Sequence, residues 1–339
     1  MGELVDLASS REYSELFLDV PQPHWHFEEG LSEVYSHYIQ SFGRQITRLN
    51  ICETASLTWD WLKPLTKLRR LTFQNRGAPG EDTISKFWDT IGKFPLEELT
   101  LWGVNFPRKR KFKSWRYLRT IILNQFYDVE GACSTILQSF PDLRRLGLHN
   151  PIVLPSIETS VPVKKVVCNK LRTIEFTRCK PQKDVLSLIA KACPHLQVCS
   201  PPDNASDDDI ITVIDSCRFL NTLSIDGCAN LTSSSIHSLP RTRRLRSVLF
   251  HTRHLEYLDE RCILALVDNC PDLHSRGCRI EAVGEKAETF QRVKVRGILP
   301  GTGRYKRWML RFVKWEQYGP FQRITIDIDE IRNEVGGRI

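Results

Sequence analysis

Few residues in this sequence combine the types and spacings that catalysis or metal binding requires. The closest histidine pairs, His24 with His26 and His251 with His254, have no carboxylates or cysteines at a ligand spacing. The stretch GTGR at 301–304 lacks the Lys-Ser/Thr of a phosphate-binding loop and the other glycines of a dinucleotide fingerprint, so we expect a turn there. No GxSxG elbow and no cysteine-protease signature accompanies the serines or thiols. The sequence therefore favours a protein without enzymatic activity, metal or cofactor.

The eleven cysteines form an odd set without a CxxC pair, which argues against a zinc ribbon and a closed disulfide framework. Reduced thiols in a reducing compartment fit this pattern. No apolar run approaches the ~20 residues that span a bilayer, and the N-terminus lacks the basic and apolar regions of a signal peptide. We expect a cytoplasmic or nuclear protein that does not associate with a membrane.

Positive charge is concentrated in two segments of a chain whose net charge is +8. Residues 108–119 hold seven basic and no acidic side chains, and residues 285–323 hold ten basic against three acidic. With tryptophan and tyrosine nearby, these segments could bind a nucleic-acid backbone or an acidic partner; a solvated loop and a solvated cap face are the alternative. PRKRKFK (107–113) also matches a nuclear-localisation signal. The basic residues singled out are Arg108, Lys109, Arg110, Lys111, Lys113, Arg304, Lys306, Arg307 and Arg311.

These side chains must be positioned by a repeated unit, whose clearest copy is the stretch 220–239. Leu220, Leu223 and Ile225 form an LxxLxL pattern that suits a short strand with one buried face, and a turn and a short helix follow. Successive copies start 22 to 28 residues apart, a period typical of leucine-rich repeats. The starts are Ile46, Leu68, Leu96, Leu118, Leu143, Leu171, Leu196, Leu220, Leu245 and Leu273.

Apolar residues at helical spacing occur between the strands, at 184–193, 209–217 and 261–270. The acidic run 207–209 lies where carboxylates cap and stabilise a helix start. Four cysteines each precede a strand-opening leucine by three residues, where a small buried hydrophobe suits a helix-to-strand corner. They are Cys168, Cys193, Cys217 and Cys270.

The repeats are flanked by two further segments. YSELFLDV (13–20) predicts a strand and 31–42 predicts a helix, which together form an N-terminal cap or irregular repeat over residues 1–45. Further strands are expected at 290–295 and 321–326, and 304–317 fits either a basic amphipathic helix or another strand. Because a solenoid needs its last apolar face covered, we expect a basic C-terminal cap over 285–339, after repeats at 46–284.

The stretches ACPHLQVC, SCRFLNTLSIDGCANLTSSSIHSL and NCPDLHSRGC resemble the cysteine-containing leucine-rich repeats of F-box/LRR proteins, the substrate-recognition subunits of cullin-type ubiquitin ligases. The similarity covers about residues 46–280 and lies in the C-P-x-L strand openings and the strand-end cysteine. The resemblance implies a repeat fold that binds protein substrates. That family carries an F-box ahead of its repeats, and the segment before YSELFLDV is too short to hold one, so we expect the recognition half alone.

In such a solenoid, positions 3, 5 and 7 of each LxxLxLx unit point outward from the strands onto the concave sheet, because side chains alternate along a strand. Trp102, flanked by charged and amide groups, would suit a protein-binding hot spot, with packing on the repeat face as the alternative. The residues that this rule places on the surface are Arg70, Gln74, Trp102, Asn124, Arg145, His149, Glu175, Asp226 and His251.

The sequence thus predicts an α/β leucine-rich-repeat solenoid, a right-handed horseshoe with parallel strands on the concave face and helices on the convex face. The expected function is a non-catalytic protein-recognition scaffold, as a substrate-binding subunit of an SCF-type ubiquitin ligase or a relative without the F-box. A protein partner is expected on the concave face, and the ligase linker subunit is expected only if an F-box exists. The alternative function is binding of nucleic acid or an acidic partner through the basic segments 108–119 and 285–323.

Overall fold

The structure is a computed structural model that divides into two compact units, Met1–Leu171 and Arg172–Ile339, each of which is described by itself. No helix in the described part of the chain is long and apolar enough to cross a membrane. The described residues are 15–19, 39–41, 43–53, 59–75, 81–107, 112, 115–152, 168–181, 183–228, 230–251, 257, 262, 265–266, 269–270, 279–284, 294–298, 305–318 and 321–331.

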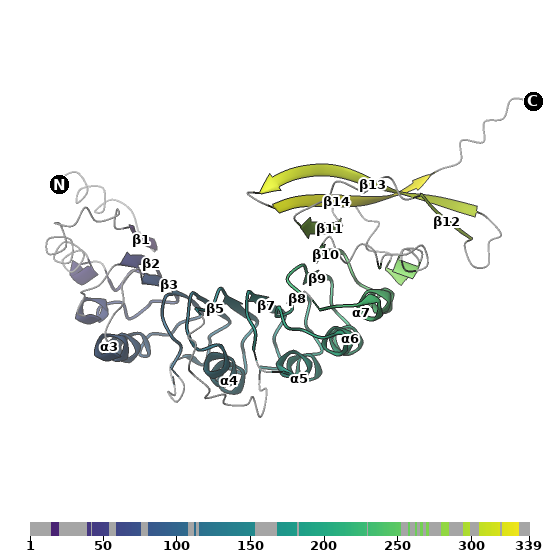
Figure 1. Ribbon diagram of the computed structural model, residues 1–339. Helices are drawn as coiled ribbons and strands as arrows, with labels where there is room; N and C mark the ends of the chain where they lie inside the picture. Colours follow the sequence, from purple (N-terminus) through teal and green to yellow (C-terminus); the bar gives the residue numbers. More distant parts are fainter. Residues whose placement is uncertain are drawn as a thin grey trace, which may run out of the picture. The chain divides into compact units, whose positions relative to one another are not determined.

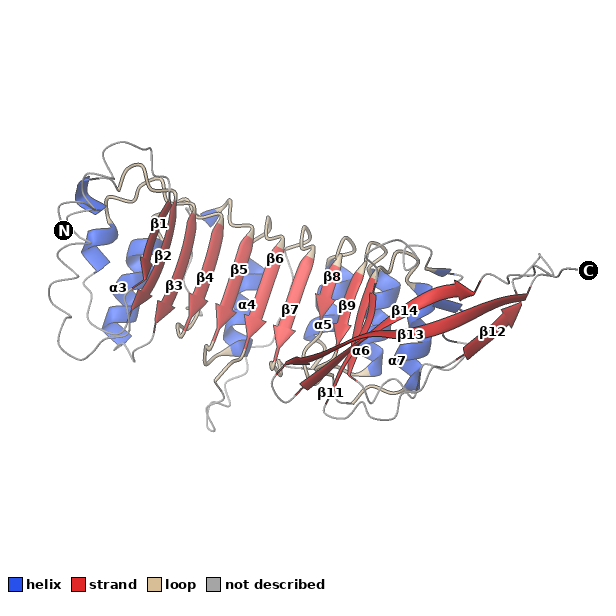
Figure 2. Ribbon diagram, turned by 90° about the horizontal axis from the view of Figure 1, so that it is seen from above, coloured by secondary structure: helices blue, strands red, loops and turns tan. Residues whose placement is uncertain are grey.

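The first unit contains parallel strands that pair in chain order, each with the next. Figures 1 and 2 show helices α3 and α4 on one side of these strands, so the opposite side of the sheet carries no described helix. The elements are β1 (Glu15–Asp19), β2 (Arg48–Glu53), η1 (Trp59–Leu62), β3 (Arg70–Asn75), α3 (Glu81–Ile91), β4 (Glu98–Trp102), β5 (Thr120–Asn124), α4 (Val129–Ser139) and β6 (Arg145–His149). Strand β1 confirms the strand expected in YSELFLDV.

The second unit begins in the same way and then changes direction. Strands β7 to β9 alternate with helices, and β8, β9, β10 and β11 each pair in parallel with the strand before. The elements are β7 (Thr173–Thr177), α5 (Val185–Ala192), β8 (Val198–Ser200), α6 (Asp207–Ser216), β9 (Thr222–Ile225), α7 (Ser233–Ser238), η3 (Leu239–Arg241), β10 (Ser247–His251), β11 (Arg279–Gly284), β12 (Lys294–Ile298), β13 (Tyr305–Tyr318) and β14 (Phe321–Ile331).

Strands β12, β13 and β14 are antiparallel, and β14 pairs with the edge of β11 that β10 leaves open. Residues 305–318 are therefore a strand, and the amphipathic helix considered for this segment is wrong. Pairing of β14 with β11 supports the expected C-terminal cap, which stays a prediction. The horseshoe curvature concerns the whole chain and also stays a prediction.

The strands form where the LxxLxL pattern places apolar residues on one face. In β9, Leu223 and Ile225 have no exposed surface, while Thr222 and Ser224 are half-buried. Each of the strands β2 to β10 begins two residues after the opening apolar residue of its repeat. The repeat expected to start at Leu273 lies outside the described residues, which resume at Arg279 with β11.

A tight turn leads into each strand at the corner of the repeat. The N–H of the opening residue donates to the carbonyl three residues earlier, and this bond recurs at eight described corners with N···O distances of 3.0–3.3 Å. The four cysteines expected at corners have no exposed surface, which confirms their packing role. Leu65, Trp115, Phe140 and Thr242 fill the same position in other repeats.

Several corner side chains also donate a hydrogen bond to the preceding repeat. The Trp115 indole N–H donates to the Ile91 carbonyl at 3.2 Å, and the Cys270 thiol donates to the Thr242 carbonyl at 2.9 Å. The Cys217 thiol lies 3.7 Å from the Ala190 carbonyl oxygen. Successive repeats are therefore linked beneath the sheet by side-chain donors as well as by strand pairing.

The acidic run 207–209 begins helix α6, as expected. Ser206 is the N-cap residue, and its hydroxyl and the Asp209 carboxylate form a capping box. Asp209 also accepts from the Ser187 hydroxyl at 2.7 Å, and Asp207 accepts from the Thr232 hydroxyl at 2.6 Å. These carboxylates therefore connect α6 to the helices before and after it.

Candidate protein-binding face

Four of the predicted surface residues form one row across the first unit. Strand register aligns Gln74, the last but one residue of β3, with Trp102, Asn124 and His149, the last residues of β4, β5 and β6. Neighbouring strands lie about 4.8 Å apart, so these residues are adjacent along the row. The structure thus brings together side chains from repeats that are separated in sequence. Side chains alternate along β4, where Leu99 and Leu101 have no exposed surface, so Trp102 lies on the face of the sheet that points away from the core.

Trp102 is the largest side chain of the row and is half-buried. Half-burial leaves part of its ring accessible while neighbours restrict its motion, a combination found at protein-binding hot spots. Thr100, two residues earlier on β4, is half-buried on the same face.

The end of β4 is fixed by Gly103, whose φ of +69° favours glycine. Its N–H donates to the Asn124 carbonyl at 2.9 Å, and its carbonyl accepts from the Asn75 side-chain amide at 3.1 Å. A Cβ at this position would lie 2.6 Å from the Asn75 carbonyl oxygen. Gly103 and Asn75 therefore hold Trp102 in place, and sequence reasoning missed both.

Asn124 and His149 complete the row, and Asn124 is less exposed than expected. Asn124 is only 7% exposed and accepts a hydrogen bond from the Asn150 side-chain amide at 3.3 Å. Its placement on an accessible surface is therefore wrong. His149 is half-buried, and its imidazole lies over Gly147. A Cβ at position 147 would lie only 2.6 Å from the His149 Nε2 atom. The small residue at position 147 makes room for the imidazole.

Charged residues occupy the opposite ends of the same strands. Arg70 and Arg145 begin β3 and β6 and are exposed, as predicted. Arg70 pairs with Glu98 of the adjacent strand at 3.4 Å. This exposed ion pair contributes little stability but sets the charge pattern of the face. The face thus grades from charged groups at the strand starts to the tryptophan row at the strand ends.

Three predicted residues belong to the second unit. Glu175 is half-buried on β7, and Asp226 follows β9, where its carboxylate accepts from the Ser224 hydroxyl at 2.6 Å. His251 ends β10, with its backbone paired opposite Val283 of β11. These residues belong to the second compact unit, whereas the tryptophan row belongs to the first.

Most of the predicted basic patch lies outside the description. Arg108, Lys109, Arg110, Lys111, Lys113 and Arg304 are not among the described residues, and Lys306, Arg307 and Arg311 are described only as backbone positions on β13. Phe112, within the first basic segment, stacks on Trp115 with ring centroids 3.9 Å apart. This ring contact holds Phe112 in place within the basic segment.

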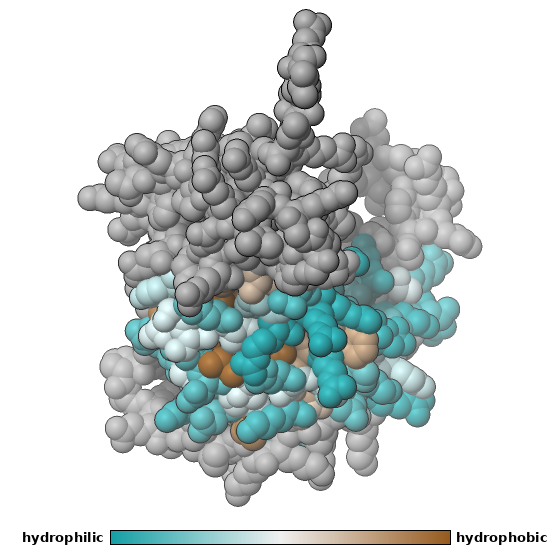
Figure 3. All heavy atoms as spheres, turned by 90° about the vertical axis from the view of Figure 1, so that its right-hand side faces the viewer, coloured by the Kyte–Doolittle hydropathy of each residue, from teal (hydrophilic) through white to brown (hydrophobic). Residues whose placement is uncertain are grey.

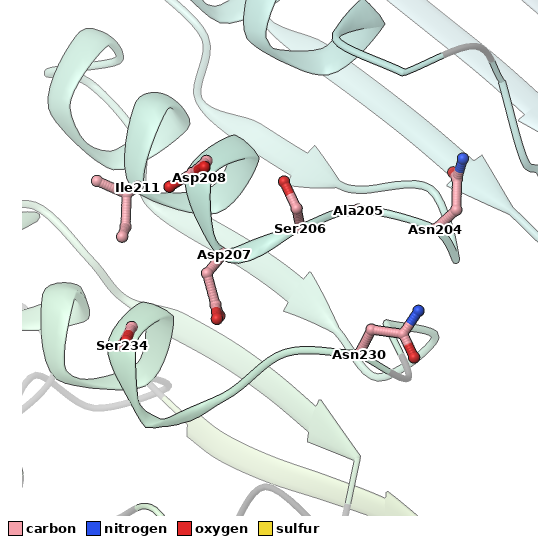
Figure 4. A pocket seen from close by; sticks show the side chains of 8 residues that line it. All are labelled: Asn204, Ala205, Ser206, Asp207, Asp208, Ile211, Asn230 and Ser234. Atoms are coloured by element: carbon pink, nitrogen blue, oxygen red, sulfur yellow. The ribbon is translucent and has the colours of Figure 1, made fainter.

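A pocket of about 510 Å³ lies at the starts of α6 and α7 (Figure 4). Its lining includes Ser206, Asp207, Asp208 and Ser234. Burial opposes the charge of Asp207, but the hydrogen bonds from Thr232 and Ser235 together outweigh burial and hold the pKa of Asp207 below its usual value. These polar groups fasten one helix start to the next, which accounts for them without a ligand.

Burial controls the chemistry of the described thiols. Burial raises the pKa of the Cys179 and Cys217 thiols to about 12, and it raises the pKa of Cys199 as well. The thiolate is the nucleophilic form, so these thiols are poorly suited to react at neutral pH. Among the described residues, no three His, Cys, Asp or Glu side chains gather into a group that could hold a metal.

No known family model matches the chain, and no curated protein matches it. Among solved structures, the fold is similar to a chain in the crystal structure of the Rad7 and Elc1 complex in yeast, with a TM-score of 0.44 and 14% sequence identity over 70% of this chain. The match covers 64% of that chain, which is less than two thirds of its length. A similarity this low carries no argument about family or function.

Proposed function

We propose that this chain is a non-catalytic protein-recognition scaffold that binds a partner through the strand face of its first compact unit. The observation that carries the proposal is the row of Gln74, Trp102 and His149, which strand register aligns on neighbouring strands and in which Trp102 alternates with buried leucines of β4. We further propose that it acts as the substrate-binding subunit of an SCF-type ubiquitin ligase, or as a relative without the F-box.

The physical support comes from rigidity and exposure. Parallel strands fix the backbone of the row, and Gly103 fixes the end of β4 through hydrogen bonds on both sides. A rigid aromatic side chain loses little conformational entropy when a partner covers it, so more of its buried area contributes to affinity. The adjacent amide and imidazole groups supply directional hydrogen bonds.

A crosslinking experiment with a matched control tests the binding face. A photoreactive amino acid at position 102 of the full chain should capture a protein that the same group at position 117 does not. Tyr117 is a suitable control because it is a 49% exposed aromatic residue of the same unit that lies on a corner turn. The captured protein is then purified, and its affinity for the unmodified chain is measured.

Trp102→Ala should weaken that affinity by about thirtyfold, the size of a hot-spot loss, while Tyr117→Ala should change it by less than about twofold. An unchanged affinity of Trp102→Ala would refute the proposal that the partner binds this strand face. The ligase role is tested separately by size-exclusion chromatography of the full natural chain with the purified linker subunit. Failure to co-elute would remove that role and leave the scaffold function intact.

A further inference from the structure

A second charged surface lies at the corners that lead into β9 and β10, in the second unit. Its members are exposed arginines that we call the arginine edge: Arg218, Arg241, Arg243, Arg244 and Arg246. Arg218 is a central residue of the corner turn that begins at Cys217, and Arg243 and Arg244 are the central pair of the turn that begins at Thr242. Corner geometry therefore directs these side chains outward from the repeat.

The two corners lie side by side. Thr222 pairs with Ser247 in register, and the Arg246 N–H donates to the Asn221 carbonyl at 2.8 Å. A side-chain contact confirms the closeness, because the Arg244 guanidinium lies 4.9 Å from the centroid of the Phe219 ring. Arginines that are distant in sequence thus form one cluster.

Among the described residues, acidic side chains are scarce in the segments that form this cluster and the corner before it. The connecting segments 191–197, 215–221 and 239–246 contain one carboxylate, Asp215, which pairs with Arg241. Five arginines against this carboxylate leave an excess of positive charge. On the side of the molecule shown in Figure 3, the described surface is mainly hydrophilic, with small separate hydrophobic areas.

Phe219 holds part of the cluster in place. Its ring is 37% exposed, with the Arg244 guanidinium over its face and the His195 ring 5.2 Å away. A guanidinium over an aromatic ring is attracted to the face of the ring, and its planar set of N–H donors suits bidentate bonds to an oxyanion. The contact with Phe219 therefore restricts the motion of Arg244 within the cluster.

We propose that the arginine edge binds an acidic peptide segment of a protein partner through carboxylate–guanidinium pairs. The cluster is compact, since it spans two neighbouring corners, and the adjacent corner at Pro194 and His195 adds no arginine. A nucleic-acid backbone favours a longer basic track with open aromatic faces for its bases. The face of Phe219 is already covered by Arg244, which favours the peptide. The arginine edge belongs to the second unit, and the tryptophan row belongs to the first.

Fluorescence anisotropy with the full chain tests the proposal. The probe is a short labelled peptide of alternating glutamate and glycine, compared with the same peptide carrying glutamine. The glutamate peptide should bind and the glutamine peptide should not. Arg243→Ala/Arg244→Ala should weaken binding by about tenfold or more. Lys180→Ala/Lys183→Ala is the control, because it removes the same charge from exposed positions beyond the opposite ends of the strands.

Equal losses in both double variants would mean attraction to the net positive charge alone and would overturn the proposal. Tighter binding of a labelled single-stranded oligonucleotide of equal charge, lost in the arginine variant, would assign the edge to nucleic acid instead. Circular dichroism and urea midpoints establish that both variants fold. Because the test does not involve Trp102, its outcome is independent of the proposed strand-face partner.

Discussion

Thr242 fills the corner position that cysteine occupies in neighbouring repeats, and replacing it with valine should stabilise the chain. Its side chain is 4% exposed, and its Oγ1 has no hydrogen-bond partner among the described residues. The backbone of this corner is fully used, because the Thr242 N–H donates to the Leu239 carbonyl at 2.9 Å and the Leu245 N–H donates to the Thr242 carbonyl at 3.2 Å. The hydroxyl is therefore the polar group of Thr242 that lacks a hydrogen bond among the described residues.

The magnitude follows from what the hydroxyl loses on burial. A buried polar group without a partner costs about 1–3 kcal/mol. Valine keeps the β-branched shape, so the side-chain rotamer preference changes little. Allowing for imperfect packing of the new methyl group, Thr242→Val should raise the free energy of unfolding by about 1–2 kcal/mol. The unfolded population would fall by about five- to thirtyfold.

Urea denaturation of the full chain, followed by circular dichroism, measures this change: the midpoint should rise while the slope stays constant. Thr90→Val is the matched control, because the Thr90 side chain is 8% exposed but its hydroxyl donates to the Lys86 carbonyl at 2.9 Å. That variant should lose about 0.5–1.5 kcal/mol. If Thr242→Val were neutral or destabilising, its hydroxyl would have a partner in solution and the reasoning would be refuted.

Three further predictions concern a turn, a carboxylate and the thiols. Gly103→Ala should destabilise the chain by about 1–3 kcal/mol in urea, because φ is positive and the backbone blocks a Cβ; Gly227→Ala, which meets only a side-chain oxygen, should cost less. Since the folded pKa of Asp207 is lowered, its stabilisation is present above about pH 4 and lost as pH falls through the folded pKa. Asp207→Asn should therefore show a weaker loss of stability on acidification, and an unchanged pH profile would contradict this. Nine of the eleven cysteines are buried free thiols, so a thiol reagent should modify at most two native thiols, Cys52 and Cys278, and all eleven in denaturant.

The strand positions could be predicted from sequence because burial alternates with a fixed offset from each opening residue. Leu223 and Ile225 must both face the core, so the strand between them has one possible register. The sequence pattern is weaker at Leu273, where Arg276 takes the fourth position that an apolar residue fills in the other repeats. Leu273 and Arg276 lie outside the described residues, so the repeat expected there stays a prediction.

The candidate face could be predicted only in part. Position in the repeat decides the direction of each side chain, so Trp102 and Arg145 lie where expected. How deeply a side chain is buried depends on its neighbours, so Asn124 is buried although its position in the repeat faces outward. The arginine edge could not be predicted as a run of basic residues, because Arg218 and Arg243 are 25 residues apart in the sequence. They become neighbours only through the pairing of β9 with β10.

The thiol bonds at the corners also determine how this part of the chain can fold. They join residues one repeat apart: 24 residues from Cys217 to Cys193, 26 from Cys262 to Ile236 and 28 from Cys270 to Thr242. No described corner bond has to wait for a distant segment, so the contact order stays low for a protein of this length. Folding can start at one repeat and spread to its neighbours, and a damaged corner weakens adjacent repeats first.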